Sequence, residues 1–334
     1  LMVDIDASET INWDGGKGFK PLRLFGKFNG NGHVIRNLYI NRSGWGYEGY
    51  IGLIGILGVV GEVKNLGLED CWVIGNENVG GLVGWNYGSI LSSYSTGAVS
   101  GSGWYVGGLV GHNYGSITNS YNTGAVSGGD YVGGLVGYNN GGSILSSYST
   151  GAVSGSWDVG GLVGDNDDGS ITSSYSTGAV SGSSSIGGLV GGNDYSGSIL
   201  SSYSTGAVSG DDDVGGLVGV NRGGIESSYS TGAVSCSGNS VGGLVGSNGG
   251  TITNFFYPQY LFHKGLVGSN GGTITNSYWD VETSGQSSSD GGEGKPTVEM
   301  KQQATYVGWD FVNVWNIVEG ITYPFLRGIA YKPE

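Results

Sequence analysis

Short apolar clusters recur along most of this chain at a nearly constant interval. The clearest is Val or Ile followed by Gly-Gly-Leu-Val-Gly, which begins at residues 79, 106, 132, 159, 186, 214 and 241. These starting points lie 26 to 28 residues apart, a period that is typical of solenoid proteins. A second cluster, in which Ile or Val precedes one variable residue and an Asn or Ser, extends the register in both directions. Its members are Ile35, Val63, Ile90, Ile117, Ile144, Ile171, Ile199, Ile225, Ile252 and Ile274.

Each repeat contains three segments that favour β-strands. In the repeat that begins at Val79 they are "GGLVG", "SILSSYS" and "GAVSG", separated by Gly, Asn and Ser turns. One repeat is too small to bury its own apolar face, so successive coils must stack with parallel strands. The sequence therefore predicts an all-β fold, a single-stranded parallel β-helix (β-solenoid) of about ten coils of ~27 residues. Parallel crossover connections favour a right-handed winding.

The repeats define three regions. We expect residues 1–24 to form an N-terminal cap, residues 25–278 the β-solenoid, and residues 279–334 a C-terminal cap or closing module. The closing module should contain one short helix near Pro296–Gln303, and caps are expected because a bare terminal coil exposes an aggregation-prone edge. The run Asn254–Gly265 replaces a polar turn with a dense apolar segment. It either folds over the core, which we favour, or forms an exposed contact patch.

Stacked coils place equivalent residues above one another, so identical residues form ladders. A buried Asn at a turn can donate to one neighbouring coil and accept from the other. The predicted Asn column is Asn86, Asn113, Asn139, Asn166, Asn193, Asn221, Asn248 and Asn270. The predicted stacking column of tyrosines is Tyr94, Tyr121, Tyr148, Tyr175, Tyr203 and Tyr229. Recurrent glycines are expected at corners that need a positive φ or a close backbone approach.

The two cysteines are predicted not to form a disulfide with each other. In the repeat register Cys71 matches Ala98 and Ala125, which indicates a buried thiol. Cys236 matches corner glycines such as Gly101 and should lie nearer to solvent. Six coils separate the two, on the order of 29 Å at ~4.8 Å per coil, whereas a disulfide joins Cα atoms no more than about 7 Å apart.

The charge distribution restricts the partners. The formal net charge is −14, and between Asn65 and Asn221 there are twelve acidic residues and no Lys or Arg. Nucleic acids and anionic lipids bind through cationic contacts, so neither is an expected partner, and no segment is long and apolar enough for membrane insertion. A neutral glycan, a cell-surface protein or self-association remain as possible partners. The opening "LMVDIDASET" has no features of a signal peptide.

The repeated "GGLVGxNxGSIxxSYSTGAVSG" resembles the GLUG motif, a glycine-rich repeat of secreted and surface-anchored microbial proteins, over about residues 79–278. "FGKFNGNGHVIRNLYI" (Phe25–Ile40) is similar to the coil that precedes such arrays. The resemblance implies an extracellular or cell-surface location. It also implies an adhesin-like role, or a non-catalytic region of an immunoglobulin-cleaving metallopeptidase. The zinc motif of those peptidases, His-Glu-x-x-His, does not occur at His33, His112 or His263.

We predict that this chain is not an enzyme. The alternative is a secreted polysaccharide-cleaving β-helix enzyme that uses a pair of turn carboxylates. The candidates for such a pair are Asp165, Asp167, Asp168, Asp194, Asp211, Asp212 and Asp213. They fall at turns with glycine neighbours, where we expect no apolar pocket that would raise a carboxyl pKa. Asp165, Asp167 and Asp168 are weak candidates for a Ca²⁺ site, but they lack the spacing of a calcium loop, and a solvated acidic turn is favoured.

Aromatic residues at the variable turns are the best candidates for recognition. Rings on a rigid ladder suit stacking on neutral sugars or on the apolar surface of a partner. We expect a partly exposed ligand-binding surface made of Trp85, Tyr87, Trp104, Tyr114, Tyr138 and Trp157. The equal alternative is that these aromatics only shield strand ends. The leading hypothesis is a non-catalytic extracellular β-solenoid for adhesion, presentation or assembly, and a third is a self-assembling sheath or filament subunit.

Overall fold

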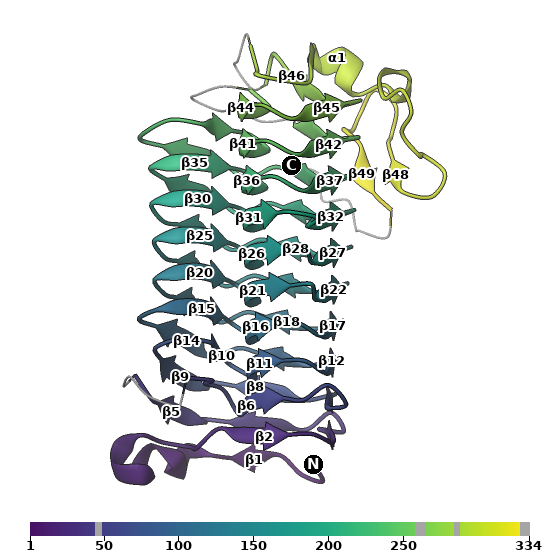
Figure 1. The fold of residues 1–334 in the computed structure, drawn as a ribbon. Helices are drawn as coiled ribbons and strands as arrows, with labels where there is room; N and C mark the ends of the chain where they lie inside the picture. Colours follow the sequence, from purple (N-terminus) through teal and green to yellow (C-terminus); the bar gives the residue numbers. More distant parts are fainter. Residues whose placement is uncertain (44–48, 258–264, 284–287, 328–334) are drawn as a thin grey trace.

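The computed structural model describes residues 1–43, 49–257, 265–283 and 288–327, and it shows a rod of stacked coils (Figure 1). A regular coil contributes one strand to each of five parallel sheets, here called sheets C, D, A, B and E in the order in which the chain visits them. The coil that begins at Val83 runs through β11 (Val83–Asn86), β12 (Ser89–Leu91), β13 (Tyr94–Ser95), β14 (Ala98–Gly101) and β15 (Trp104–Gly107). The all-β parallel solenoid is therefore confirmed.

Among the described residues, sheets C and D each contain ten strands, which confirms ten coils. The strands of sheet C are β2 (Leu22–Leu24), β6 (Ile54–Leu57), β11, β16 (Val110–Asn113), β21 (Val136–Asn140), β26 (Val163–Asp167), β31 (Val190–Asp194), β36 (Val218–Asn221), β41 (Val245–Asn248) and β44 (Val267–Asn270). Those of sheet D are β3 (Lys27–Asn29), β7 (Glu62–Lys64), β12, β17 (Ser116–Thr118), β22 (Ser143–Leu145), β27 (Ser170–Thr172), β32 (Ser198–Leu200), β37 (Gly224–Glu226), β42 (Thr251–Thr253) and β45 (Thr273–Thr275).

Three further sheets complete the sides of the rod. Sheet A contains β1 (Ile5–Asp6), β4 (Val34–Arg36), β8 (Gly67–Glu69), β13, β18 (Tyr121–Asn122), β23 (Tyr148–Ser149), β28 (Tyr175–Ser176), β33 (Tyr203–Ser204), β38 (Tyr229–Ser230), β43 (Phe256–Tyr257), β46 (Tyr278–Asp280) and β47 (Glu293–Lys295). Sheet B contains β5 (Tyr39–Asn41), β9 (Trp72–Gly75), β14, β19 (Val126–Ser127), β24 (Val153–Ser154), β29 (Val180–Ser181), β34 (Val208–Gly210) and β39 (Val234–Cys236). Sheet E contains β10 (Val79–Gly80), β15, β20 (Asp130–Gly133), β25 (Trp157–Gly160), β30 (Ser184–Gly187), β35 (Asp212–Gly215) and β40 (Val241–Gly242).

The expectation of three strands per repeat is wrong, because a regular repeat has five. The segment "SILSSYS" does not stay extended: Ser92 adopts a left-handed φ of 46°, which separates β12 from β13. The Val and first Gly of the Val-Gly-Gly-Leu-Val-Gly cluster form the separate strand β10, and the chain turns a corner before β11. The division of the Val-Gly-Gly-Leu-Val-Gly cluster into β10 and β11 creates the corner between sheets E and C on which the candidate site lies.

The isoleucine column is confirmed from Val63 onwards and is wrong at its first member. Its buried members pair in register, including Ile90, Ile117, Ile144, Ile171 and Ile199. Val63, however, pairs with Phe28 in β3, and Ile35 lies in β4, where it pairs with Leu68. Ile35 carries the expected Ile-x-Asn pattern and Phe28 does not, so the pattern alone selected the wrong residue.

The asparagine ladder is confirmed. From Asn86 to Asn248, each side-chain Nδ2 donates to the Oδ1 of the equivalent Asn one coil later, at 2.6 to 2.8 Å. These amides lie almost entirely inside the rod, where an unpaired polar group would destabilise the fold. The ladder therefore lets the core contain amides beside its Val, Leu and Ile side chains.

The tyrosine column on sheet A is also confirmed. Rings of successive coils from Tyr94 to Tyr229 stack with centroids 4.8 to 5.0 Å apart and interplanar angles of at most 9°. Phe256 continues the stack at 5.6 Å. The repetition of Tyr through six successive coils is thus explained by contact with its own copies.

Corner glycines are needed for close approach of the backbone. A Cβ added to Gly124 would lie 1.9 Å from the carbonyl oxygen of Gly97. Left-handed corner positions are instead taken by short polar residues, as at Ser92 and Asn119, whose φ angles are 46° and 49°. Asn and Ser at these corners can hydrogen-bond locally, which makes the conformation less unfavourable.

Both cysteines are free, as predicted, with Cys71 buried and Cys236 partly exposed. Cys236 pairs with the corner residue Gly210, which is the expected register. Cys71 lies one residue before its expected position, because Trp72 is the residue that pairs with Ala98.

The two ends of the rod depart from the repeat. The N-terminal region contains two 3-10 helices, η1 (Ser8–Asn12) and η2 (Asp14–Gly16). The C-terminal region contains α1 (Thr297–Met300), within the predicted helical segment, then η3 (Gln303–Thr305) and the antiparallel pair β48 (Trp315–Asn316) and β49 (Phe325–Leu326). Figure 1 shows β48 and β49 beside the final coils and α1 at the end of the rod.

Aromatic side chains attach the C-terminal region to the last coils. The rings of Trp309 and Trp315 lie 4.5 Å apart, and both contact Phe256. Phe255, Phe256 and Tyr257 are buried, which confirms the core-facing interpretation for this part of the run Asn254–Gly265. Residues 258–264 of that run lie outside the described residues.

Candidate functional site

One column of sheet C changes its residue type from coil to coil. This variable column comprises Trp85, His112, Tyr138, Asp165, Gly192 and Val220, each paired with the next in parallel register. In these strands a buried Val precedes the variable residue by two positions and a buried Asn follows it. Because the Val and the Asn supply the core contacts of each strand, the variable column is free to serve another role.

A second column lies across the same corner, directly before the Val-Gly or Ile-Gly that opens each repeat. Its residues, with φ angles between 50° and 62°, are Asn78, Tyr105, Tyr131, Asp158, Ser185, Asp213 and Ser240. Asn and Asp are enriched in this left-handed conformation, whereas a bulky Tyr is an outlier. Tyr105 and Tyr131 therefore hold an unfavourable backbone conformation, and such outliers concentrate at functional sites.

Rings of the two columns and their neighbours meet in one aromatic cluster. We define it as Tyr50, Trp85, Tyr87, Tyr105, His112, Tyr114, Tyr131 and Tyr138. Trp85 stacks on His112 with centroids 4.4 Å apart, and His112 stacks on Tyr114 at 4.6 Å. Tyr105 covers the stack from sheet E, 5.1 Å from His112 and 5.0 Å from Tyr138. The rings form one continuous set of contacts that extends over several coils.

The structure places four of the six predicted ligand-binding residues in this cluster. They are Trp85, Tyr87, Tyr114 and Tyr138. Tyr87 and Tyr114 are 42% and 39% exposed, and Trp85 and Tyr138 are half-buried. Trp104 is exposed at the edge of the cluster, 6.4 Å from Tyr105, and Trp157 is exposed in β25, two coils beyond Trp104.

Four members of the cluster are not among the predicted binding residues: Tyr50, Tyr105, His112 and Tyr131. Tyr105 and Tyr131 carry a signal that the sequence offers, because other repeats have Asn, Asp or Ser at their position. Tyr50 comes from an irregular coil and carries no such signal. His112 is buried, and burial lowers its pKa to about 4, so it is a neutral, flat ring at pH 7.

Beyond Tyr138 the variable column becomes acidic. Asp165 is only 7% exposed, and burial, together with the charges of Asp194 and Asp158, raises its pKa to about 8. Burial also raises the pKa of Asp158 to about 6. The expectation that these carboxyls lack a pocket that raises the pKa is wrong for Asp165, because it belongs to strand β26 and not to the solvated turn that follows. It is also wrong for Asp213, whose pKa is raised by partial burial.

A gap in the variable column lies next to Asp165. Gly192 has no side chain, and a Cβ placed on it would lie 3.1 Å from Oδ1 of Asp165 and 3.3 Å from Oδ1 of Asp158. Two carboxyls therefore face one empty side-chain position, which we call the Gly192 notch. Asp194 forms an ion pair with Arg222 at 2.8 Å.

The weak calcium candidates have different surroundings. Asp167 accepts a hydrogen bond from the hydroxyl of Tyr138, whereas Asp168 accepts one from the backbone N–H of Ser196. Asp165 faces the Gly192 notch. Across the part of the chain that the structure describes, no three His, Cys, Asp or Glu side chains form a group that could hold a metal ion.

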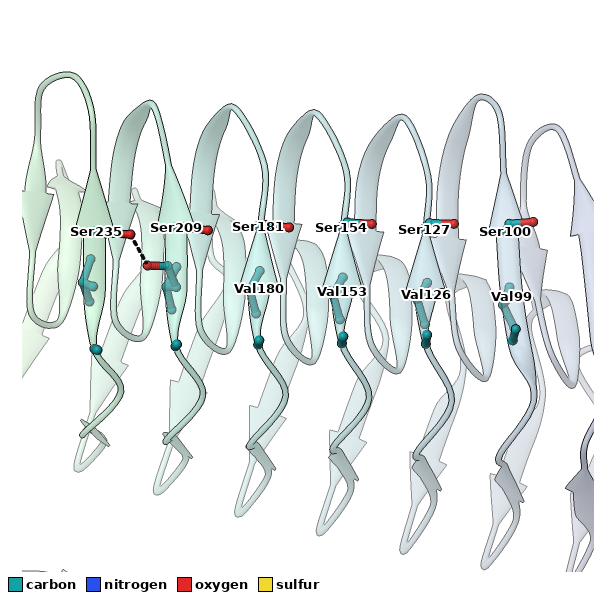
Figure 2. A pocket seen from close by; sticks show the side chains of 18 residues that line it. Val99, Ser100, Val126, Ser127, Val153, Ser154, Val180, Ser181, Ser209 and Ser235 are labelled. Atoms are coloured by element: carbon teal, nitrogen blue, oxygen red, sulfur yellow. Dashed lines mark hydrogen bonds between the residues drawn. The ribbon is translucent and has the colours of Figure 1, made fainter.

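A groove of about 500 Å³ runs along sheet B, away from this corner (Figure 2). The same three residue types from six successive coils line it, for example Ala98, Val99 and Ser100. Figure 2 shows the serines of these coils aligned in a row. Small neutral side chains provide little to orient a ligand, so the aromatic corner is the better candidate.

The coils that carry the candidate site match a known repeat. The GLUG motif matches residues 75–100, 102–127, 128–154 and 155–181, which include most of the aromatic cluster and Asp165. The chain is therefore a β-solenoid that contains GLUG-motif repeats.

Two known proteins are similar to this chain. Halomucin of Haloquadratum walsbyi is 37% identical over 110 residues, which make up 30% of this chain and 1% of halomucin. A crystal structure of a Bacteroides ovatus protein, provisionally named an immunoglobulin A1 protease, is similar over 98% of this chain and 84% of that chain. The identity is 20% and the TM-score 0.41, a similarity that carries no argument about function.

Proposed function

We propose that this chain is a non-catalytic, extracellular β-solenoid that binds glycan chains through the aromatic cluster. The observation that carries the proposal is the cluster itself, a set of rings in mutual contact that includes Tyr105 and Tyr131 in left-handed conformation. Coil stacking does not require this arrangement, because the tyrosine column of sheet A stacks without it. Partly exposed aromatic rings such as Tyr87 and Tyr114 suit contact with the apolar faces of sugar rings.

Charge and polar neighbours favour a glycan that carries no negative charge. The formal net charge of −14 disfavours uronate and sulfated chains. Polar groups for sugar hydroxyls lie beside the rings, since Asp167 accepts from the Tyr138 hydroxyl and Asn140 donates to it. A mainly aromatic surface with a few placed polar groups is typical of ligand sites.

The setting of this binding is adhesion or presentation at a cell surface. The GLUG-motif repeats and the similarity to halomucin support that location. Within the described ranges of the chain, no helix is both long and apolar enough to cross a membrane.

Calorimetric titration with neutral oligosaccharides tests the proposal. We expect Trp85→Ala and Tyr114→Ala each to weaken binding about tenfold or more, as for aromatic hot spots in other interfaces. The matched control is Tyr195→Ala, since Tyr195 is an exposed tyrosine at a turn outside the cluster. Equal affinity of all three variants, or no binding to any neutral oligosaccharide, contradicts the proposal.

Glycan cleavage is the second candidate, and the raised pKa values of Asp158 and Asp165 favour it. A glycosidase uses one protonated and one ionised carboxyl of such a pair. Prolonged incubation with oligosaccharides tests it: products that form with the wild type and not with Asp165→Asn support cleavage, and unchanged oligosaccharides support binding alone.

A further inference from the structure

We infer that the Gly192 notch binds a protonated amino group, and therefore that the glycan held by this chain contains free amino sugars. The inference rests on the proposed glycan binding and specifies the chemical class of the ligand. It uses the acidic end of the variable column, whereas the proposed function uses the aromatic end.

One carboxyl oxygen of the notch lacks a hydrogen-bond partner, whereas the carboxyl of Asp158 has a hydrogen bond with the side chain of Ser185. Oδ1 of Asp165 is buried and, among the described residues, has no hydrogen-bond partner, although it points at the empty position above Gly192. Oδ1 of Asp158 faces the same position from the other side of the corner. A buried acceptor without a donor destabilises the folded state, so a ligand that supplies a donor here gains the full value of the hydrogen bond.

An ammonium group fits this environment better than a metal ion. It donates three hydrogen bonds, and its positive charge favours the ionised form of a carboxyl. Binding of an ammonium group at pH 7 therefore releases the proton that Asp165 otherwise keeps, and the contact that forms is the strong, charge-assisted kind. Ca²⁺ takes six to eight oxygen ligands, whereas two carboxyls face the notch. Asp194, whose charge has the largest influence on Asp165, already has the guanidinium of Arg222 as its counter-charge.

The size of the notch also distinguishes binding from cleavage. Both carboxyl oxygens lie within 3.3 Å of the single point where a Cβ of Gly192 would be. A space the size of one side-chain atom can hold the nitrogen of an amino group. A glycosidase instead needs enough space for a sugar ring between its two carboxyls. The geometry therefore favours recognition of a small charged group.

The position of the notch along the rod favours an amino sugar over a lysine side chain. Tyr138, Asp165 and Gly192 follow one another in the variable column, one coil apart. At ~4.8 Å per coil, the notch lies roughly 10 Å from the last ring of the column. A glycan that stacks on the aromatic cluster and extends along the column therefore reaches the notch within the same chain.

Calorimetric titration at about pH 7 with matched oligomers of glucosamine and of N-acetylglucosamine tests the inference. We expect the wild type to bind the amino form at least about tenfold more tightly, as for a hydrogen bond to a charged group. Asp165→Asn should remove this preference, and Gly192→Ala should also remove it, because the new Cβ fills the notch without changing any charge. The matched control is Asp211→Asn, which removes an exposed carboxylate that accepts from Ser237 on another turn and should keep the preference.

Three results overturn the inference and are distinguishable from failure of the proposed function. The first is equal affinity of the wild type for both oligomers, or a preference that survives both notch variants. If the acetylated oligomer then still binds in a Trp85-dependent manner, the proposed function stands and only the inference fails. The second is stoichiometric binding of CaCl₂ alone that Asp165→Asn abolishes. The third is tight binding of a lysine-rich peptide that depends on Asp165 and not on Trp85, which indicates a protein partner.

Discussion

Two columns of the same rod follow opposite rules. On sheet A one tyrosine position repeats through six coils from Tyr94 to Tyr229, and each ring stacks flat on its own copy. At the corner of sheets C and E the variable column changes from Trp85 through Asp165 to Val220. Both columns are built on the same regular backbone ladder, so the difference lies entirely in the side chains.

The contrast distinguishes residues that hold the coils together from residues that are available to bind a partner. A column of identical residues is explained by contact between copies, and exchange of one member removes contacts on both sides. A column of unlike residues is not explained in this way. At the corner of sheets C and E it coincides with bulky residues in left-handed conformation and with a buried, unpaired carboxyl oxygen.

The largest effect is expected in the regular core. Ile144→Asp places an unpaired charge in the buried isoleucine column and should lower the free energy of unfolding of the surrounding coils by roughly 4 kcal/mol or more. The control is Leu145→Asp, whose side chain lies 43% exposed on the outer side of the same strand and should change stability by no more than about 1 kcal/mol. Urea unfolding and hydrogen exchange measure both, and similar values for the two variants contradict the assigned register.

The next largest effect is the pH dependence of stability, which is expected to come from Asp165 in the variable column. The folded-state pKa of Asp165 lies near 8, above the ordinary value for Asp, so the folded chain keeps a proton that the unfolded chain releases. The free energy of unfolding should therefore fall as the pH rises from about 4 to about 8, by up to a few kcal/mol, and level off above that. Neighbouring charges also influence the pKa of Asp165. It is raised by the carboxylates of Asp194, Asp158 and Asp167 and lowered by the guanidinium of Arg222.

Asp165→Asn should flatten this pH dependence, because the amide does not titrate. Asp211→Asn should leave it unchanged. Thermal unfolding of the three proteins at several pH values measures the slopes, and a wild-type stability that rises over this range contradicts the assigned burial of Asp165.

A smaller effect is expected in the asparagine ladder. Asn166→Ala removes the hydrogen bonds to Asn139 and Asn193 and leaves buried polar atoms unpaired on both sides. The expected loss is about 1 to 3 kcal/mol for each unpaired group. Chemical unfolding measures the loss, and a change below about 0.5 kcal/mol shows that the ladder does not hold the coils together.

The smallest effect on stability is expected at the left-handed column. Tyr105→Asn introduces the residue that occupies the equivalent position at Asn78 and relieves an unfavourable conformation, while ring contacts with His112 and Tyr138 are lost. Stability should change by no more than about 1 kcal/mol, because the two effects oppose each other. Glycan binding should weaken severalfold. Unchanged binding together with a large loss of stability identifies Tyr105 as a packing residue only.

The fold could be predicted from the sequence because residues at equivalent positions of successive repeats stack on one another in the rod. The asparagine, tyrosine and isoleucine columns follow directly from the repeat. The first coil does not obey the repeat closely, and there the pattern selected Ile35 where the structure places Phe28.

The candidate site could be predicted only in part, because it combines residues from two strands on either side of the corner between sheets E and C. Trp85, Tyr87, Tyr114 and Tyr138 are recognisable from their spacing within sheet C. Tyr105, Tyr131 and Asp158 come from the preceding strand of sheet E, and their left-handed backbone turns them towards sheet C. Linear spacing contains no sign of that turn, so it reveals neither the burial of Asp165 nor the notch above Gly192.

The most direct test of the account is hydroxyl-radical footprinting of the chain with and without a bound oligosaccharide. If the corner of sheets C and E is the recognition surface, Trp85, Tyr87 and Tyr114 become protected when the ligand binds. Trp72 and Tyr195, which are exposed elsewhere on the rod, should keep their reactivity. Protection of those two residues, or of the groove along sheet B, with unchanged reactivity at the aromatic cluster contradicts the account.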